Sequence, residues 1–174
     1  KSSGLGGFFG VSFAYDGRSL ITPMTDGTVR VWDAETGDVL KTYAGHMGSV
    51  QDVAISPDGA LLATAGTDRT VRLWTTGLVG ELNAFSLGPA TTLLAIDYSP
   101  DGQQVATNSA AGPAVWNPAT GEQVLALPQV HESGGSYAVA YSPDGTLLAI
   151  GTASGPVHIW DFQSQEYVQT LTGH

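Results

Sequence analysis

Apolar and polar residues alternate along short runs of this chain, and residues that favour tight turns separate the runs. The clearest example is Leu61–Trp74, where two alternating runs flank a Gly/Thr/Asp/Arg turn. A period of two with β-branched residues predicts the two strands of an antiparallel hairpin. The preceding Ser56–Gly59, Ser-Pro-Asp-Gly, predicts a second turn, because proline presets φ and glycine tolerates a positive φ. The stretch therefore predicts part of a small antiparallel sheet.

The same pattern returns along the whole chain at a nearly constant spacing. Asp-Gly pairs recur at intervals of 42, 43 and 43 residues, and tryptophans at intervals of 42, 42 and 44. These markers are Asp16, Asp58, Asp101 and Asp144, and Trp32, Trp74, Trp116 and Trp160. Two independent markers with one period indicate four copies of a repeat. We expect the units to span about 7–45, 46–88, 89–130 and 131–174.

Each unit is predicted to contain four short strands. In the first unit they are Val11–Tyr15, Ser19–Pro23, Thr28–Asp33 and Val39–Ala44, and the other units repeat them near 50–87, 93–127 and 136–171. A single sheet of this size cannot bury both of its faces, so the sheets must stack face to face. The expected fold class is therefore all-β, built from four blades of four antiparallel strands.

These residues carry a resemblance to the WD-repeat β-propeller family. It rests on Gly45-His46, Ser56–Gly59, Thr64, Asp68 and Val71–Trp74, and on the dipeptides Trp32-Asp33 and Trp160-Asp161. The resemblance implies a hydrogen-bonded structural tetrad in the second unit, namely His46, Thr64, Asp68 and Trp74. Such a network satisfies the buried indole N–H and imidazole.

The other units depart from this pattern. The first has Gly4 or Leu5 in place of the histidine, and the third has Pro89 there and Ala110 or Ala111 at the turn. The fourth has His131 one residue out of step, with Ile150 for the threonine and Ser154 for the aspartate. We therefore expect the third and fourth units to depend on apolar packing.

Rings of the resembled family close with more blades than four, commonly seven. Four blades form an arc whose end faces expose apolar surface. Three resolutions remain open, in this order: a partial ring completed by a missing remainder of the chain, two copies that associate into an eight-bladed ring, and an unusual closed four-bladed ring.

The charge distribution narrows the choice of partner. The net charge is −10, of which residues 1–72 contribute −2 and residues 73–174, which contain no Lys or Arg, contribute −8. An acidic surface repels phosphate backbones, which disfavours nucleic acid as a partner. Two interpretations of the charge remain: it only keeps the protein in solution, or it attracts a basic protein partner. No apolar run reaches the roughly 18 residues needed to span a bilayer, and no signal peptide is visible. We expect a cytoplasmic protein without a membrane partner.

Catalytic and metal-binding patterns are missing from the sequence. The nearest run to a hydrolase nucleophile elbow, Gly134–Ala138, lacks the final glycine. The absence of cysteine excludes thiolate sites. The four histidines, His46, His131, His158 and His174, fall in different blades or at an outward strand position, which favours structural or solvent-facing roles over a metal site. We expect a non-enzymatic chain without a cofactor or metal.

The resemblance places partner binding on the narrow top of the blades, just after the histidine and just before the turn aspartate. Carried over, this predicts a protein-binding set of Phe9, Met47, Ser49, Gln51, Thr67, Leu94 and Tyr137. By the same offset Gly7, Thr25, Ala90, Thr92, Ser109, Ser133 and Ala153 lie on this surface. Exposed aromatic and apolar side chains are typical of interface hot spots, although some could instead fill the core between blades.

The sequence therefore favours a protein-interaction scaffold that binds a protein or peptide on its top face and self-associates to complete its ring. One alternative is a regulatory or sensor propeller attached to a larger signalling enzyme, a kinase or an NTPase. A propeller hydrolase is a weaker alternative, because no polar residues are seen to converge on a central channel.

Overall fold

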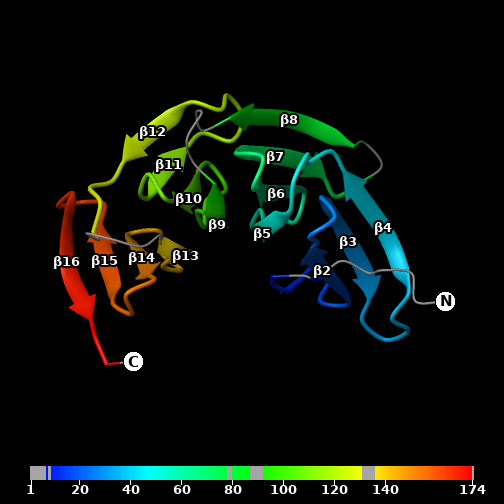
Figure 1. Cartoon of the computed structure of the whole chain (residues 1–174), viewed down its shortest axis with the longest axis horizontal. Helices are drawn as coiled ribbons and strands as arrows, with labels where there is room; N and C mark the ends of the chain where they lie inside the picture. The colour runs from blue at the N-terminus through cyan, green and yellow to red at the C-terminus, as the bar shows by residue number, and fades with distance from the viewer. Residues whose placement is uncertain (1–6, 8, 78–79, 87–91, 131–135, 174) are drawn as a thin grey trace.

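The computed structural model describes residues 7, 9–77, 80–86, 92–130 and 136–173, in which sixteen strands form four antiparallel sheets. Each sheet has four strands in chain order, so neighbouring strands are joined by short hairpin connections. The sheets follow one another as blades around an open arc (Figure 1), with β5, β9 and β13 on its inner side and β4, β8, β12 and β16 on its outer side. The expected all-β class of four-stranded blades is confirmed.

The strands of the first two blades match the predicted runs closely. The first blade contains β1 (Ser12–Phe13), β2 (Ser19–Pro23), β3 (Thr28–Asp33) and β4 (Val39–Ala44). The second contains β5 (Val50–Ile55), β6 (Leu61–Gly66), β7 (Thr70–Thr75) and β8 (Glu81–Ser86). β1 is shorter than the predicted Val11–Tyr15; it ends at Phe13, where the Ala14 N–H donates to the Ser19 carbonyl at 2.8 Å and closes the turn.

The last two blades repeat this order. The third contains β9 (Leu93–Tyr98), β10 (Val105–Ser109), β11 (Ala114–Trp116) and β12 (Gln123–Ala126). The fourth contains β13 (Ser136–Tyr141), β14 (Leu147–Thr152), β15 (Val157–Asp161) and β16 (Glu166–Leu171). β11 has only three residues, in the unit where the sequence lacks one residue at the preceding turn.

The Ser-Pro-Asp-Gly segments form the turns between the first and second strands. In the second blade Ser56 Oγ donates to Asp58 Oδ1 at 2.5 Å, and the Ala60 N–H donates to the same oxygen at 3.0 Å. Gly59 has a φ of 71°, which favours glycine. In the fourth blade, hydrogen bonds from Ser142 and Thr146 lower the pKa of Asp144 to about 2. These carboxylates are therefore used within their own turns.

Each tryptophan marks a register shift between the third and fourth strands of its blade. In the first blade Val31 pairs with Lys41 while Trp32 pairs with Val39, which leaves Leu40 as an extra residue. An extra residue of this kind bends the strand and increases its twist. The extra residues are apolar and exposed in all four blades, namely Leu40, Leu82, Val124 and Val168.

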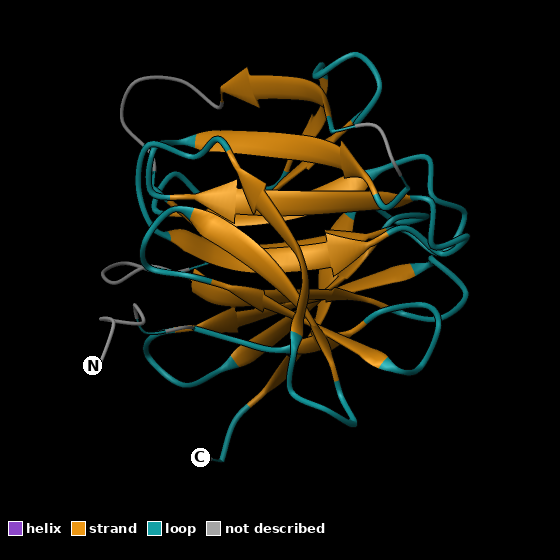
Figure 2. Ribbon diagram, turned by 90° about the vertical axis from the view of Figure 1, so that its right-hand side faces the viewer, coloured by secondary structure: helices purple, strands orange, loops and turns teal. Residues whose placement is uncertain are grey.

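The buried core lies between consecutive blades, which stack as layers of strands in the side view of Figure 2. One apolar cluster joins the first and second blades, a second joins the second and third, and a third joins the third and fourth. The first and fourth blades stand at the two ends of the arc (Figure 1). The structure thus does not form the closed four-bladed ring, the last of the three resolutions considered from the sequence, because its end blades are not brought together.

Candidate functional site

The second blade holds a continuous chain of polar contacts from its tryptophan to its top edge, the edge that carries residues 45–49 and the β6–β7 turn. Trp74 Nε1 donates to Thr64 Oγ1 at 3.0 Å, and Thr64 Oγ1 lies 2.7 Å from His46 Nε2. His46 Nδ1 lies 2.9 Å from Asp68 Oδ1. Every atom is satisfied when the Thr64 hydroxyl donates to Nε2 and the Nδ1–H donates to the carboxylate. Such an arrangement requires a neutral His46.

The electrostatics of this chain agree with that protonation. The His46 side chain is only 1% exposed, and burial lowers the pKa of His46 below its usual value despite the adjacent Asp68. Burial alone would raise the pKa of Asp68, but hydrogen bonds from the Met47 N–H, His46 and Thr70 outweigh it and lower that pKa. At neutral pH the site therefore contains a neutral imidazole and an ionised carboxylate.

Asp68 also fixes the loop that enters the second blade. Its Oδ2 accepts the Met47 N–H at 2.9 Å, and its Oδ1 accepts the Thr70 hydroxyl at 2.8 Å. The Met47 side chain itself is 92% exposed. A rigid backbone thus presents a fully exposed apolar side chain.

Hydrogen bonds connect this loop to the first blade along the top edge. The Thr25 N–H donates to the Gly7 carbonyl at 2.9 Å, and Ser49 Oγ donates to the Thr25 carbonyl at 3.1 Å. The Thr67 N–H donates to the Ser49 carbonyl at 2.9 Å. The structure therefore brings Ser49 and Thr67 together next to Met47, and it ties them to the segment that precedes Phe9.

The remaining residues of the predicted binding set have different environments. Phe9 is 58% exposed, whereas Gln51 and Leu94 are half-buried. Tyr137 lies in β13, and its side chain falls outside the described residues. Ser109 was expected on the surface, but it is buried because its Oγ donates to the Gly112 carbonyl at 3.2 Å inside the β10–β11 turn. That expectation was wrong.

The other blades keep parts of the second blade's network. Trp32 Nε1 donates to Thr22 Oγ1 at 2.7 Å, and Trp116 Nε1 donates to Thr107 Oγ1 at 2.8 Å. Trp160 Nε1 is buried and finds no hydrogen-bond partner among the described residues. The positions expected to replace histidine in the other units, Gly4 or Leu5, Pro89 and His131, lie outside the described residues, as do Ala90, Ser133 and His174.

Sequence reasoning missed two carboxylates that join neighbouring blades. Asp52 in β5 accepts the Ile96 N–H of β9 at 2.9 Å, and Asp97 in β9 accepts the Tyr141 N–H of β13 at 2.8 Å. Burial raises the pKa of both groups, and that of Asp52 reaches about 6. The two aspartates lie at different offsets from their Asp-Gly turns, so the repeat alignment does not pair them. Their shared role is visible only in the structure, where each aspartate accepts a backbone N–H from the first strand of the following blade.

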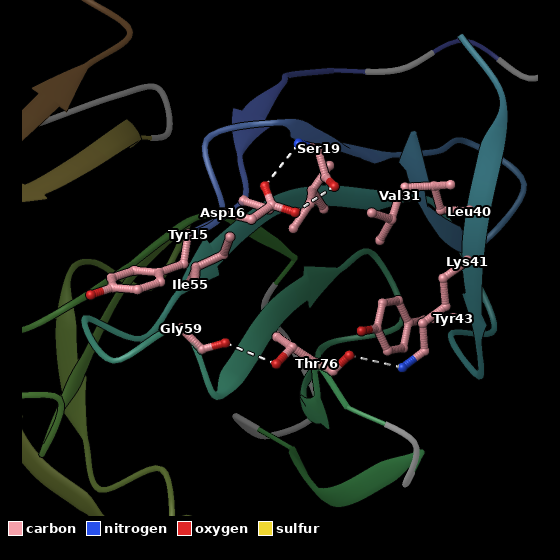
Figure 3. A pocket seen from close by; sticks show the side chains of 12 residues that line it. Tyr15, Asp16, Ser19, Val31, Leu40, Lys41, Tyr43, Ile55, Gly59 and Thr76 are labelled. Carbon is pink, nitrogen blue, oxygen red and sulfur yellow. Dashed lines mark hydrogen bonds between the residues drawn. The ribbon is translucent and has the colours of Figure 1, made fainter. Parts of the chain in front are cut away.

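A hollow of about 480 Å³ opens between the first two blades on the edge opposite the top edge (Figure 3). Most of its polar side chains are already bonded within the chain. The Tyr43 hydroxyl donates to the Thr75 carbonyl at 3.2 Å, Thr76 Oγ1 donates to the Gly59 carbonyl at 2.8 Å, and Lys41 Nζ donates to carbonyls of residues 75–77. The bonds from Lys41 and Tyr43 hold the first blade to the second, so the hollow is part of the structural interface between these blades.

Neither a metal centre nor a membrane segment emerges from the described part of the chain. No three His, Asp or Glu side chains there are grouped so that they could hold a metal ion. His158 is half-buried, and its Nδ1 lies 3.0 Å from Thr170 Oγ1. Those residues also contain no helix with the length and apolar character to cross a bilayer.

Relatives resemble short stretches of the chain. The probable E3 ubiquitin ligase complex SCF subunit sconB of Arthroderma otae is 50% identical over 36 residues, which cover 21% of this chain and 5% of that protein. The WD repeat-containing protein pop1 of Schizosaccharomyces pombe is 41% identical over 44 residues, which cover 25% of this chain and 6% of that protein. The similarity therefore spans a small part of each relative.

The repeat is also matched at the level of a protein family. The family model described as "WD domain, G-beta repeat" matches residues 5–33, 37–75 and 122–161, which together exceed half of the chain. Most of the third blade falls between two of these matches, and it has Ala110-Ala111 where the other turns carry Asp or Ser. Four blades of four strands, a threonine–tryptophan bond in the first three of them and these family matches agree with one another. The chain therefore belongs to the WD40 repeat family.

Proposed function

We propose that this chain is a non-enzymatic protein-interaction scaffold that binds a protein or peptide on its top edge. The binding residues are Phe9, Met47, Ser49, Gln51, Thr67, Leu94 and Tyr137. Membership of the WD40 family and the relative described as a subunit of a ubiquitin ligase complex support an assembly role.

The exposure of Met47 carries this proposal. Its side chain projects from a backbone N–H that is fixed by the Asp68 carboxylate at 2.9 Å. Asp68 is fixed in turn by His46 and Thr70. A rigid backbone loses little conformational entropy on binding, so an exposed apolar side chain on it suits an interface anchor.

The charge of the chain favours a basic partner. Residues 73–174 contribute a net charge of −8, and they contain neither Lys nor Arg. Long-range attraction of this kind acts mainly on the association rate and weakens as salt screens it. A basic peptide is therefore expected to associate faster at low ionic strength than an acidic one.

Alanine substitutions test the binding set. Phe9→Ala, Met47→Ala, Leu94→Ala and Tyr137→Ala, made singly and together, are expected to release partners captured from a lysate by the wild-type chain. Val124→Ala is the matched control, because Val124 is a similarly exposed apolar residue on the outer strand β12. If the combined variant keeps its wild-type melting temperature and still captures every partner, the proposed site is wrong.

A regulatory propeller attached to a larger signalling enzyme is the second candidate. The matched segments cover only 5 and 6% of the relatives described above, so each matched segment is a small part of a much longer chain. Sequencing the full open reading frame tests this candidate, and a kinase or NTPase domain in it would favour it over a free-standing scaffold. A propeller hydrolase would instead show activity on a panel of esters, glycosides and peptides.

A further inference from the structure

Every seam between consecutive blades pairs the same two faces. The front face of a blade carries its tryptophan and packs on the preceding blade, whereas its back face packs on the following one. At the first seam the ring centroids of Tyr43 and Trp74 lie 5.5 Å apart, and at the second those of Phe85 and Trp116 lie 6.0 Å apart. At the third seam, Trp160 shares an apolar cluster with Leu127. The three seams thus follow one rule.

The front face of the first blade lacks this cover. Phe13 is 64% exposed, whereas Tyr98, also three residues before an Asp-Gly turn, is 4% exposed in the third blade. Trp32 is half-buried, whereas Trp74 in the second blade is fully buried. Val11 adds further exposed apolar surface beside Phe13. The first blade therefore presents a tryptophan face of the usual kind with no blade against it.

The back face of the fourth blade is open in the complementary way. Leu171 pairs with Val157 as Tyr43 pairs with Val29 in the first blade, so the two pairs are equivalent by register. Leu171 is 43% exposed, whereas Tyr43 is 5% exposed. Val157 is half-buried, whereas Val29 is fully buried. The fourth blade thus carries the residues that cover a tryptophan face, but no such face meets them.

The glycines of the Asp-Gly turns give an independent sign of the same gap. A Cβ at Gly59, Gly102 or Gly145 would contact the residue before the Asp-Gly turn of the preceding blade, which is Tyr15, Pro57 or Pro100 respectively. A Cβ at Gly17, in the first blade, would meet nothing within 4 Å. The corresponding residue of the fourth blade is Pro143, and no glycine of the described residues lies against it. The contact between Asp-Gly turns of neighbouring blades is therefore unmade at Gly17 of the first blade and at Pro143 of the fourth.

We propose that a second copy of this chain covers both open faces, so that two copies close an eight-bladed ring. The front face of the first blade in one copy packs on the back face of the fourth blade in the other, and two-fold symmetry repeats the contact. Leu171 then covers Trp32, and Pro143 meets Gly17, as the three internal seams prescribe. Both open faces are satisfied at once because they are the two halves of one seam. This proposal goes beyond the top-edge function and does not depend on it.

The mass of the chain in solution tests this proposal. Light scattering after size-exclusion chromatography is expected to give twice the chain mass of 18.0 kDa at micromolar concentration. Phe13→Asp alters the front face and Leu171→Asp the back face, and both residues are exposed in the single chain, so each variant should fold. Burying an unpaired carboxylate in an apolar seam is expected to raise the dimer dissociation constant at least ~100-fold. Val124→Asp, a similarly exposed residue away from both faces, should leave the dimer intact.

Mixing the two face variants distinguishes front-to-back packing of the two faces from unspecific association. In a dimer of two identical variant chains, both seams contain one altered face. In a dimer of one Phe13→Asp chain and one Leu171→Asp chain, the two altered faces meet in one seam and the other seam is wild-type. The equimolar mixture should therefore contain more dimer than either variant alone, at unchanged melting temperatures of the monomers. A wild-type mass of 18.0 kDa, as expected if another protein or a further segment covers these faces, overturns the proposal. A ladder of larger oligomers, or an equal loss of dimer in Val124→Asp, overturns it as well.

Discussion

The second and fourth blades hold their tryptophans in opposite ways. In the second blade, Trp74 donates to Thr64, which also contacts His46, and the chain of bonds continues to Asp68 at the surface. In the fourth blade, Ile150 occupies the register position of that threonine, and Trp160 Nε1 finds no partner among the described residues. Both indoles are 3% exposed. Burial of the tryptophan thus does not depend on the hydrogen bond.

This difference separates two roles of the tryptophan. Its ring fills the seam with the preceding blade, a role that the second and fourth blades share. In the second blade, its N–H also ties the ring to the top-edge loop through the threonine, histidine and aspartate. The second blade can therefore position Met47 rigidly, whereas the described residues of the fourth blade form no corresponding network. In the family pattern, the tryptophan thus serves packing between blades, whereas the threonine, histidine and aspartate serve to position the loop.

Breaking the network at its centre should have the largest effect. Thr64→Val keeps the side-chain shape but leaves Trp74 Nε1 without an acceptor and His46 Nε2 without a donor, both in buried positions. Two unmatched buried groups are expected to lower the free energy of unfolding by about 4 kcal/mol. Urea unfolding followed by tryptophan fluorescence measures this loss.

The first blade supplies the control for that experiment. Thr22 accepts the Trp32 N–H, as Thr64 accepts that of Trp74, but no histidine contact is seen at Thr22 among the described residues. Trp32 is also half-buried on an open face. Thr22→Val should therefore cost about 1 kcal/mol, because water can reach the freed indole. Equal losses in the two variants would show that the imidazole contributes nothing and that the network is only a set of separate bonds.

The sequence was sufficient to predict most of the fold, because each strand is defined locally. Alternation and turn residues place Ser19–Pro23, Thr28–Asp33 and Val39–Ala44 at the observed bounds of β2, β3 and β4. The open arc could be expected as well, since four sheets leave two end faces without cover. Boundaries failed only where pairing ends early, as in β1.

The contacts across the seams could not be predicted in the same way. Asp52 and Asp97 serve one purpose, yet they stand six and four residues before their Asp-Gly turns. The repeat alignment compares residues at the same distance from their Asp-Gly turns. These bonds instead join an aspartate to a residue of the following blade that lies one position nearer to its own Asp-Gly turn. Lys41 likewise reaches carbonyls of residues 75–77 that no local pattern connects to it. The proposed top-edge residues remain a prediction, since no bound partner tests them.

The seam carboxylates extend the comparison to the inner strands. Asp52 links the second blade to the third, whereas β13 of the fourth blade contains no carboxylate. Burial, with a further contribution from the charge of Asp97, raises the pKa of Asp52 from 3.8 to about 6. The folded chain then holds an extra proton between those values, so this group lowers stability as pH rises through that window. The loss amounts to about 2 kcal/mol between pH 4 and pH 7.

Asp52→Asn removes this titration. Relative to wild type, the variant should gain about 2 kcal/mol of unfolding free energy between pH 4 and pH 7, measured by urea unfolding at each pH. The lowered pKa of His46 gives an opposite slope below its ordinary value, but it is present in both proteins and cancels in the difference. Asp144→Asn is the matched control. The pKa of Asp144 is lowered from 3.8 to about 2, so this variant should instead lose stability relative to wild type as pH rises from about 2 to 4.

Restoring the missing hydroxyl in the fourth blade should have the smallest effect and gives the sharpest comparison. Ile150 stands ten residues before Trp160, as Thr22 and Thr64 stand before their tryptophans, whose N–H groups they accept at 2.7 and 3.0 Å. Ile150→Thr and Ile150→Val differ only in a hydroxyl against a methyl group. In an apolar core the valine variant is ordinarily the more stable, because the hydroxyl must be desolvated. Here Ile150→Thr should be more stable than Ile150→Val by about 1 kcal/mol in urea unfolding, since the hydroxyl supplies the acceptor that the indole lacks. The ordinary order, with the valine variant ahead, would mean that the Trp160 N–H is already satisfied and that the two blades differ only in their loops.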